Sequence, residues 1–179
     1  MTRTGRRFVA AWPAYAITAA VGAFVAVVGA LWVAAHVVAR QPVDATAWII
    51  LLATLLRAVT VVIALSSVRR WGRALPPVVV LTGLWACAAA QLAYPVAELA
   101  VKLALVAGVV DLPATGIGDL GATGWFNLSA AWVIFGLPGA LFVAAAVSYR
   151  NRRSVSGPWP VVGMLTGTAL LFALGWLIG

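Results

Sequence analysis

Charged residues are scarce in this sequence. Only 9% of its 179 residues are Asp, Glu, Lys or Arg, whereas 64% are hydrophobic, and the mean hydropathy is +1.07. A soluble domain carries about 25% charged residues, so this composition excludes a water-soluble globular protein. Because a membrane-crossing helix needs about 20 apolar residues, the chain has room for one membrane domain of roughly four to six spans.

Cysteine and histidine are also nearly absent. Cys87 is the only cysteine and lies within an apolar run, which excludes an intramolecular disulfide and a thiolate metal site. The single histidine and the scattered acidic residues have no metal-ligand spacing, and the sequence contains no phosphate-binding glycine loop, dinucleotide fingerprint or haem-attachment motif. We therefore expect neither a metal ion nor a cofactor.

Apolar runs divide the chain into five expected helices. The basic first seven residues resemble the start of a signal peptide, but the apolar stretch that follows is too long for a cleavable one, so we interpret it as an uncleaved span. The expected spans are residues 12–38, 47–68, 76–94 with an extension to 110, 125–149 and 159–178. The sequence thus predicts an all-α, polytopic helical bundle, with residues 1–179 forming a single integral-membrane domain.

The third span is longer than a bilayer requires. Apolar character continues from Pro76 to Val110, which would make a straight helix of about 52 Å. Pro95 interrupts the run, so we expect a long third helix that is kinked there. Residues 96–110 then form either an extension of this helix or a re-entrant segment.

Basic residues outnumber acidic ones by 12 to 4. In the five-span topology nine arginines fall on one side, namely Arg3, Arg6, Arg7, Arg69, Arg70, Arg73, Arg150, Arg152 and Arg153. The positive-inside rule places that side in the cytoplasm, with the N-terminus inside and the C-terminus outside. Since the arginines occur in short clusters between spans, we expect the lipid bilayer of the cell membrane as their partner and no nucleic acid.

Arg57 is the least expected residue, because it lies near the middle of the second span. A charge at that depth costs about 2.5 to 3.5 kcal/mol on insertion scales, so the side chain must face a partner, a cavity or a ligand. In a structural role it snorkels, or it donates to helix-end carbonyls and to Gln91, the polar residue of the third span nearest in depth. In a functional role Arg57 and Gln91 bind a ligand.

Glu98 and Lys102 are spaced i, i+4, the favourable order for an ion pair on one helix face. Alternatively, Glu98 or Asp111 acts as a proton donor at a poorly solvated mouth, with Lys102 binding ligand beside it. His36, at the outer end of the first span, either terminates that span or relays protons to these acids.

Two glycine patterns predict helix packing. Gly163 and Gly167 form a GxxxG pattern, whose small side chains let another helix approach closely, within the chain or from a second copy or a partner protein. Gly136, Pro138 and Gly139 should interrupt the helical hydrogen bonds of the fourth span.

The chain resembles a family of small polytopic bacterial membrane proteins catalogued as a domain of unknown function. The resemblance covers residues 10 to 153 and rests on the motifs Trp12-Pro13-Ala14-Tyr15, Arg57, Val68 to Pro76, Trp85, Tyr94, Trp125 and Tyr149-Arg150-Asn151-Arg152-Arg153. It implies the polytopic topology and no particular activity. Relatives are expected to carry a His beside the tryptophan that opens the fourth span, where this chain has Phe126.

Two classes of function remain open. The first is a non-enzymatic accessory component or small-molecule-binding bundle, which the sparse polar inventory favours. The second is a membrane-embedded enzyme on a lipophilic substrate, such as an acid-initiated isoprenoid cyclase, which this chain resembles in size, span count and scarcity of acids. In that case Glu98 or an outer aspartate such as Asp111 supplies the proton, and aromatic residues that include Trp85, Tyr94 and Trp125 line the cationic path.

Overall fold

The computed structural model describes residues 9–178, and all regular elements among them are helical. Five helical stretches are long and apolar enough to cross a membrane, namely Trp12–Val38, Ala45–Ser66, Pro77–Val106, Ala122–Arg153 and Trp159–Trp176. They confirm the expected spans to within about one helical turn. The chain therefore has the architecture of a multi-pass membrane protein.

The first two spans form a helical hairpin. It consists of α1 (Trp12–Val33), the π-helical turn η1 (Ala34–Val38) and α2 (Ala45–Ser66). Asp44 caps α2, because its carboxylate accepts a hydrogen bond from the N–H of Ala47 at 2.7 Å. The indole of Trp32 donates to the carbonyl of Ala47 at 2.9 Å. Both contacts fix the tip of the hairpin.

The third span is one continuous helix. A short 3₁₀ turn, η2 (Arg70–Ala74), leads into α3 (Pro77–Val106), which begins with a proline and passes through Pro95 without interruption. A proline at the helix start lacks only an N–H that would have no partner there. The residues after Pro95 thus extend the helix to Val106, and the alternative of a re-entrant segment is wrong.

The fourth span changes its helical pitch midway. The loop before it contains the 3₁₀ turn η3 (Gly116–Gly118). The span itself consists of α4 (Ala122–Ala131), the π-helical segment η4 (Trp132–Gly136) and α5 (Leu137–Arg153), and α6 (Trp159–Ile178) follows it. The predicted departure from α-helical hydrogen bonding is confirmed, and it takes the form of a π-helical segment that ends at Gly136, just before Pro138. Such segments often occur at functional sites.

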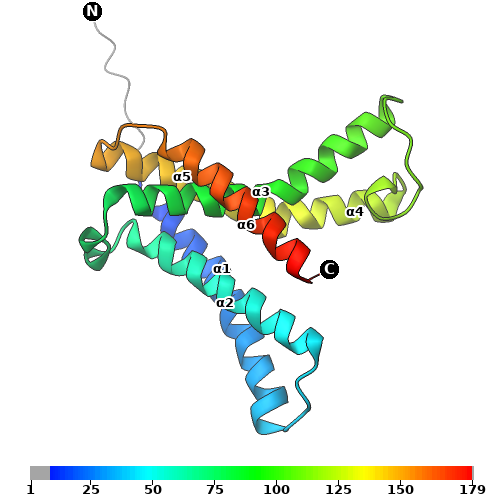
Figure 1. Ribbon diagram of the computed structural model, residues 1–179, viewed down its shortest axis with the longest axis horizontal. Coiled ribbons are helices and arrows are strands. Elements are labelled where there is room, and N and C mark those ends of the chain that lie inside the picture. Colours follow the sequence, from blue (N-terminus) through cyan, green and yellow to red (C-terminus); the bar gives the residue numbers. More distant parts are fainter. Residues whose placement is uncertain (1–8, 179) are drawn as a thin grey trace, which may run out of the picture.

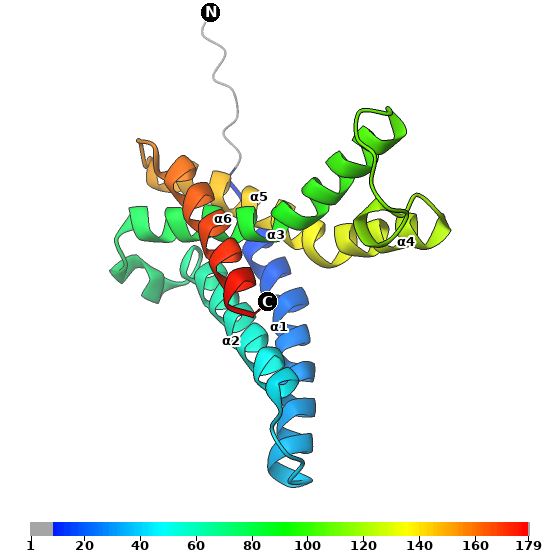
Figure 2. The same ribbon diagram turned by 45° about the vertical axis from the view of Figure 1, so that its right-hand side comes forward.

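The helices meet at one end of the molecule and diverge at the other. In Figures 1 and 2 the α1–α2 hairpin forms one arm. The C-terminal half of α3 and α4 form a second arm, which diverges from the first. The buried core lies where the arms join, in the halves of the helices nearest the arginine-bearing turns. It is built from Ile17, Val21, Ala64, Val80, Leu81, Leu84, Cys87, Ala88, Phe142, Ala145, Ala146 and Tyr149.

The C-terminal helix packs across α3 through the GxxxG pattern (Figure 1). A Cβ on Gly163 would lie 2.6 Å from the Cβ of Trp85, and one on Gly167 would lie 2.1 Å from the carbonyl oxygen of Ala86. The two glycines therefore allow α6 to approach the backbone of α3 closely. The face expected for an intramolecular helix or a second copy is thus occupied within the chain.

Candidate functional site

A buried ion pair lies on the C-terminal half of α3. Glu98 and Lys102 are one turn apart on the same helix face, and the Nζ of Lys102 lies 3.6 Å from Oε1 of Glu98. Their side chains are only 2% and 0% exposed. The predicted ion pair is therefore present, but it is buried rather than at a surface.

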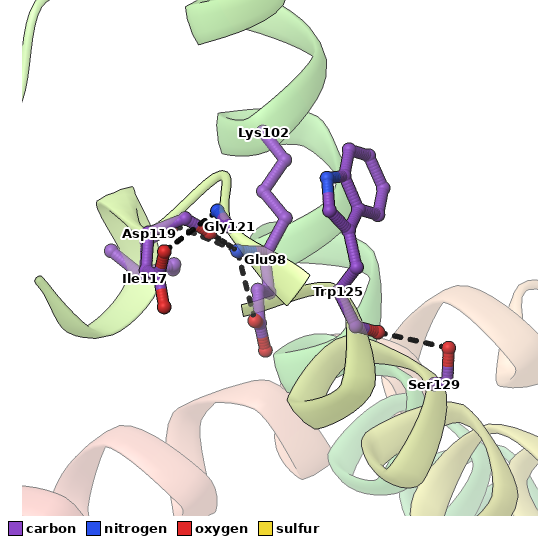
Figure 3. A network of polar contacts seen from close by, with 7 residues as sticks. All are labelled: Glu98, Lys102, Ile117, Asp119, Gly121, Trp125 and Ser129. Carbon is purple, nitrogen blue, oxygen red and sulfur yellow. Dashed lines mark hydrogen bonds and ion pairs between the residues drawn. The ribbon is translucent and has the colours of Figure 1, made fainter. Parts of the chain in front are cut away.

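The loop between α3 and α4 closes over this pair (Figure 3). The Lys102 ammonium donates to the carbonyl of Asp119 at 2.5 Å and to that of Ile117 at 3.4 Å, while it lies 5.9 Å from the ring centroid of Trp125. The carboxylate of Asp119 accepts the N–H of Gly121 at 2.7 Å, which holds the loop in shape. We call Glu98, Lys102 and the carbonyls of Ile117 and Asp119 the α3 clasp.

Glycine makes the closing loop possible. A Cβ on Gly118 would lie 2.2 Å from the carbonyl oxygen of Pro113, and one on Gly124 would lie 1.9 Å from that of Asp119. Any larger side chain would push the loop backbone away from Lys102. One atom of the clasp remains without a hydrogen-bond partner among the described residues, the buried Oε2 of Glu98.

Arg57 lies where the two arms join. Its guanidinium stacks between two phenylalanine rings, 5.0 Å from the centroid of Phe24 on α1 and 5.1 Å from that of Phe135 in η4. The π faces of the rings attract the cation electrostatically. Within residues 9–176 the guanidinium forms no hydrogen bond or ion pair, so its N–H donors have no acceptor from the described part of the chain.

Tyr94 extends this cluster onto α3. Its ring meets that of Phe135 edge to face, with centroids 6.3 Å apart, and it is 50% exposed. Phe24, Arg57, Phe135 and Tyr94 therefore connect α1, α2, η4 and α3, and we call them the Arg57 cluster. The phenolic hydroxyl of Tyr94 is a polar group at the edge of this cluster.

Gln91 and Trp85 have other surroundings. Gln91 is buried against α5. A Cβ built on Gly139 of α5 would lie 3.3 Å from the Cβ of Gln91. Trp85 packs against α6 and the core, and its indole N–H is buried without a partner among the described residues. The structure thus gives both residues packing positions, and among the described residues Gln91 forms no hydrogen bond with Arg57.

His36 and Asp111 are also separated from Glu98. His36 lies at the tip of the first arm. Its ring is tilted against that of Trp32, with centroids 4.8 Å apart, and its Nδ1 lies 3.3 Å from the carbonyl oxygen of Gln41. It lines a shallow pocket of about 350 Å³ there, whereas Glu98 lies on the second arm (Figure 1). Asp111 is exposed in the loop after α3. The described residues thus do not bring the predicted histidine relay together, and they contain no cluster of three or more His, Cys, Asp or Glu that could hold a metal ion.

Sequence reasoning missed the two rings beside Arg57 and the two loop carbonyls that accept from Lys102. Phe24 and Phe135 come from other helices and look like ordinary lipid-facing residues in the sequence. The carbonyls of Ile117 and Asp119 belong to the backbone, which gives no sequence signal. The glycine-rich composition of residues 111–124 was the one available sign that the loop folds back closely.

Comparison with protein-family models, curated proteins and solved structures gives no match for this chain.

Proposed function

We propose that this chain is a non-enzymatic accessory component of the cell membrane that binds a lipophilic small molecule at the Arg57 cluster. The arginine-bearing turns face the cytoplasm in this proposal, with the N-terminus inside and the C-terminus outside, as the positive-inside rule favours. The observation that carries the proposal is the Arg57 guanidinium, which lies between two aromatic rings with no acceptor among residues 9–176.

The physical argument concerns the donors of this guanidinium. An arginine carries five N–H groups and stays charged, so placing it near the middle of an apolar helix without an acceptor is costly. The two phenylalanines offset part of that cost through the ring quadrupole, but they accept no conventional hydrogen bond. A ligand with an apolar body and a carbonyl or carboxylate oxygen satisfies the donors and packs against the rings.

The α3 clasp supports a structural role for the other buried charges. Lys102 pairs with Glu98 and donates to two loop carbonyls, and these contacts hold the long loop against α3. This arrangement orders the second arm and leaves Arg57 as the charged group inside the spans that is available to a ligand. The role of Glu98 and Lys102 in this proposal is therefore to hold the site in shape.

The test is lipid extraction and native mass spectrometry of protein purified gently from its own membrane. We expect a lipophilic compound in the wild type, retained by the control Arg40→Gln, an exposed loop arginine, and reduced about tenfold by Arg57→Gln. Loss of a hydrogen bond to a charged group corresponds to a change of that size or more. A wild type without any bound compound would overturn the proposal.

An acid-initiated isoprenoid cyclase is the second candidate, and the buried, unpartnered Oε2 of Glu98 is the observation that favours it. Against it, Trp85 packs against α6, away from Glu98, and the carboxylate of Glu98 is paired with Lys102. The same extraction from Glu98→Gln separates the two functions. The binding proposal expects the same compound in both proteins, whereas a cyclase expects a linear precursor to replace the product in this variant.

A further inference from the structure

A second feature lies at the opposite end of the molecule from the two arm tips. There the turn between α2 and α3 meets the end of α5 (Figure 1), and a pocket of about 280 Å³ opens between them. Four arginines line it, together with the side chain of Tyr149. These are Arg69, Arg73, Arg152 and Arg153, and we call the pocket the arginine pocket.

The backbone fixes the arginines around this pocket. A Cβ on Gly72 would lie 1.8 Å from the carbonyl oxygen of Ser66, so only glycine lets the turn that carries Arg69 and Arg73 close onto the end of α2. On the facing side, Arg152 donates to the carbonyl of Ser67 at 3.0 Å. The pocket is thus built from two segments held together by specific contacts.

Tyr149 contributes an unused donor. Its side chain is 2% exposed, it lines the pocket, and its hydroxyl has no hydrogen-bond partner among the described residues. A buried hydroxyl without a partner costs about 1 to 3 kcal/mol, so such a group usually indicates a missing acceptor. The nearby hydroxyls of Ser66 and Ser67 donate to carbonyls of their own helix and do not serve it.

No carboxylate side chain neutralises the pocket. The sequence has four acidic residues, and all of them lie elsewhere: Asp44 caps α2, Glu98 pairs with Lys102, and Asp111 and Asp119 lie in the loop after α3. Four arginines and a tyrosine hydroxyl therefore present donors and positive charge to one small space without a counter-ion from an acidic side chain. Guanidinium groups match the oxygens of a phosphate in charge and geometry.

We propose that the arginine pocket binds a phosphate group, supplied by the headgroup of an anionic phospholipid. The pocket lies where α2 and α5 end and α3 begins, which is headgroup depth for helices that cross a bilayer. Basic pockets between transmembrane helices are a known basis for recognising anionic headgroups. This site is separate from the Arg57 cluster and does not depend on the ligand proposed there.

The test compares the full chain in nanodiscs of phosphatidylcholine alone, in nanodiscs that also contain phosphatidylglycerol, and in phosphatidylcholine nanodiscs with added inorganic phosphate. Binding is measured by native mass spectrometry and by the shift of the thermal unfolding midpoint. The double variant Arg73→Gln/Arg153→Gln removes two charges from the pocket. Its matched control Arg70→Gln/Arg150→Gln removes two charges at the same end from residues that do not line the pocket.

We expect phosphatidylglycerol to bind the wild type and to raise its unfolding midpoint, whereas phosphatidylcholine does neither. The pocket variant should lose about tenfold or more in affinity, and the control less than about threefold, because exposed charges act only through the screened surface potential. Tyr149→Phe should bind several-fold more weakly while folding as stably as the wild type without lipid, since its lost hydroxyl has no partner in the protein.

The outcomes separate the sources of the phosphate. Inorganic phosphate could stabilise the wild type but not the pocket variant, while phosphatidylglycerol has no effect. That result would support the phosphate site but would overturn the lipid as the source of the phosphate, in favour of a dissolved phosphate compound. Equal losses in the pocket variant and its control would overturn the proposal, because they would show a general charge effect. If Tyr149→Phe and the pocket variant each bind phosphatidylglycerol as tightly as the wild type does, the proposal is overturned as well.

Discussion

Two aromatic faces hold the charge of Arg57 in an otherwise apolar region. The phenylalanines come from α1 and η4, so the residue joins three parts of the chain that are far apart in sequence. Lys102 is the opposite case, because its charge is matched by a carboxylate and two carbonyls. The two cations should therefore respond differently to removal.

Replacing Arg57 by methionine should leave the empty protein as stable as the wild type or more stable by about 1 kcal/mol. The variant loses cation–π attraction of about 1 to 2 kcal/mol but no longer holds a charge whose insertion costs about 2.5 to 3.5 kcal/mol. Unfolding of lipid-depleted protein in detergent measures the difference, with Phe24→Leu as the control that loses only the attraction. A loss of several kcal/mol would show that Arg57 is mainly structural.

Replacing Lys102 by methionine should destabilise the protein by about 3 to 5 kcal/mol. The change leaves the Glu98 carboxylate buried without its partner and removes the donor from two loop carbonyls. The double variant Glu98→Gln/Lys102→Met should recover part of the loss, because no buried charge then remains unpaired. Denaturant unfolding of both proteins provides the comparison, and equal stability of wild type and single variant would contradict the clasp.

At the level of helices, most of the architecture was predictable and the joints between helices were not. Apolar runs give the length and number of the spans directly, because each run must cover the hydrocarbon core. The continuity of α3 through Pro95 was one of two expected alternatives, and the sequence did not decide between them, since a proline in a long membrane helix can bend, break or be tolerated. The π-helical form of η4 likewise depends on packing between Trp132 and Gly136, where a Cβ would lie 2.4 Å from the indole.

The contact between α6 and α3 gives a prediction for Gly167. Alanine normally stabilises a helix relative to glycine by about 0.5 to 1 kcal/mol, but at this position its Cβ would overlap the carbonyl of Ala86. Gly167→Ala should therefore cost about 1 to 3 kcal/mol as an overpacked contact. Gly175→Ala is the control on the same helix, because nothing lies within 4 Å of that position. Thermal unfolding of the two variants should move in opposite directions.

At the level of the whole molecule, the charges are distributed by sign. Arg69, Arg73, Arg152 and Arg153 surround one pocket, and the acidic residues lie along the two diverging arms. The positive-inside rule predicted that the arginine-bearing turns share a side, and the described turns do lie at one end (Figure 1). That these turns share one pocket depends on the packing of α5 against α3, and hydropathy does not predict which helices pack together.

Thiol labelling checks the proposed orientation. Cys87 is the only cysteine and is buried, so a Cys87→Ala background allows single exposed cysteines to be placed by Gln41→Cys, Arg70→Cys and Asp111→Cys. A membrane-impermeant maleimide should label positions 41 and 111 in intact cells, and position 70 only after permeabilisation. The reverse pattern would place the arginine pocket outside the cell.

The separation of charge gives the molecule an electric polarity along the membrane normal. In the proposed orientation its positive end faces the negative interior of an energised cell, where each elementary charge moved across the membrane corresponds to about 2.3 kcal/mol per 100 mV. An inverted chain would have to hold its arginine-bearing turns on the positive side of that voltage. In the proposed orientation the resting potential therefore favours the bundle as inserted, and this contribution decreases when the membrane is depolarised.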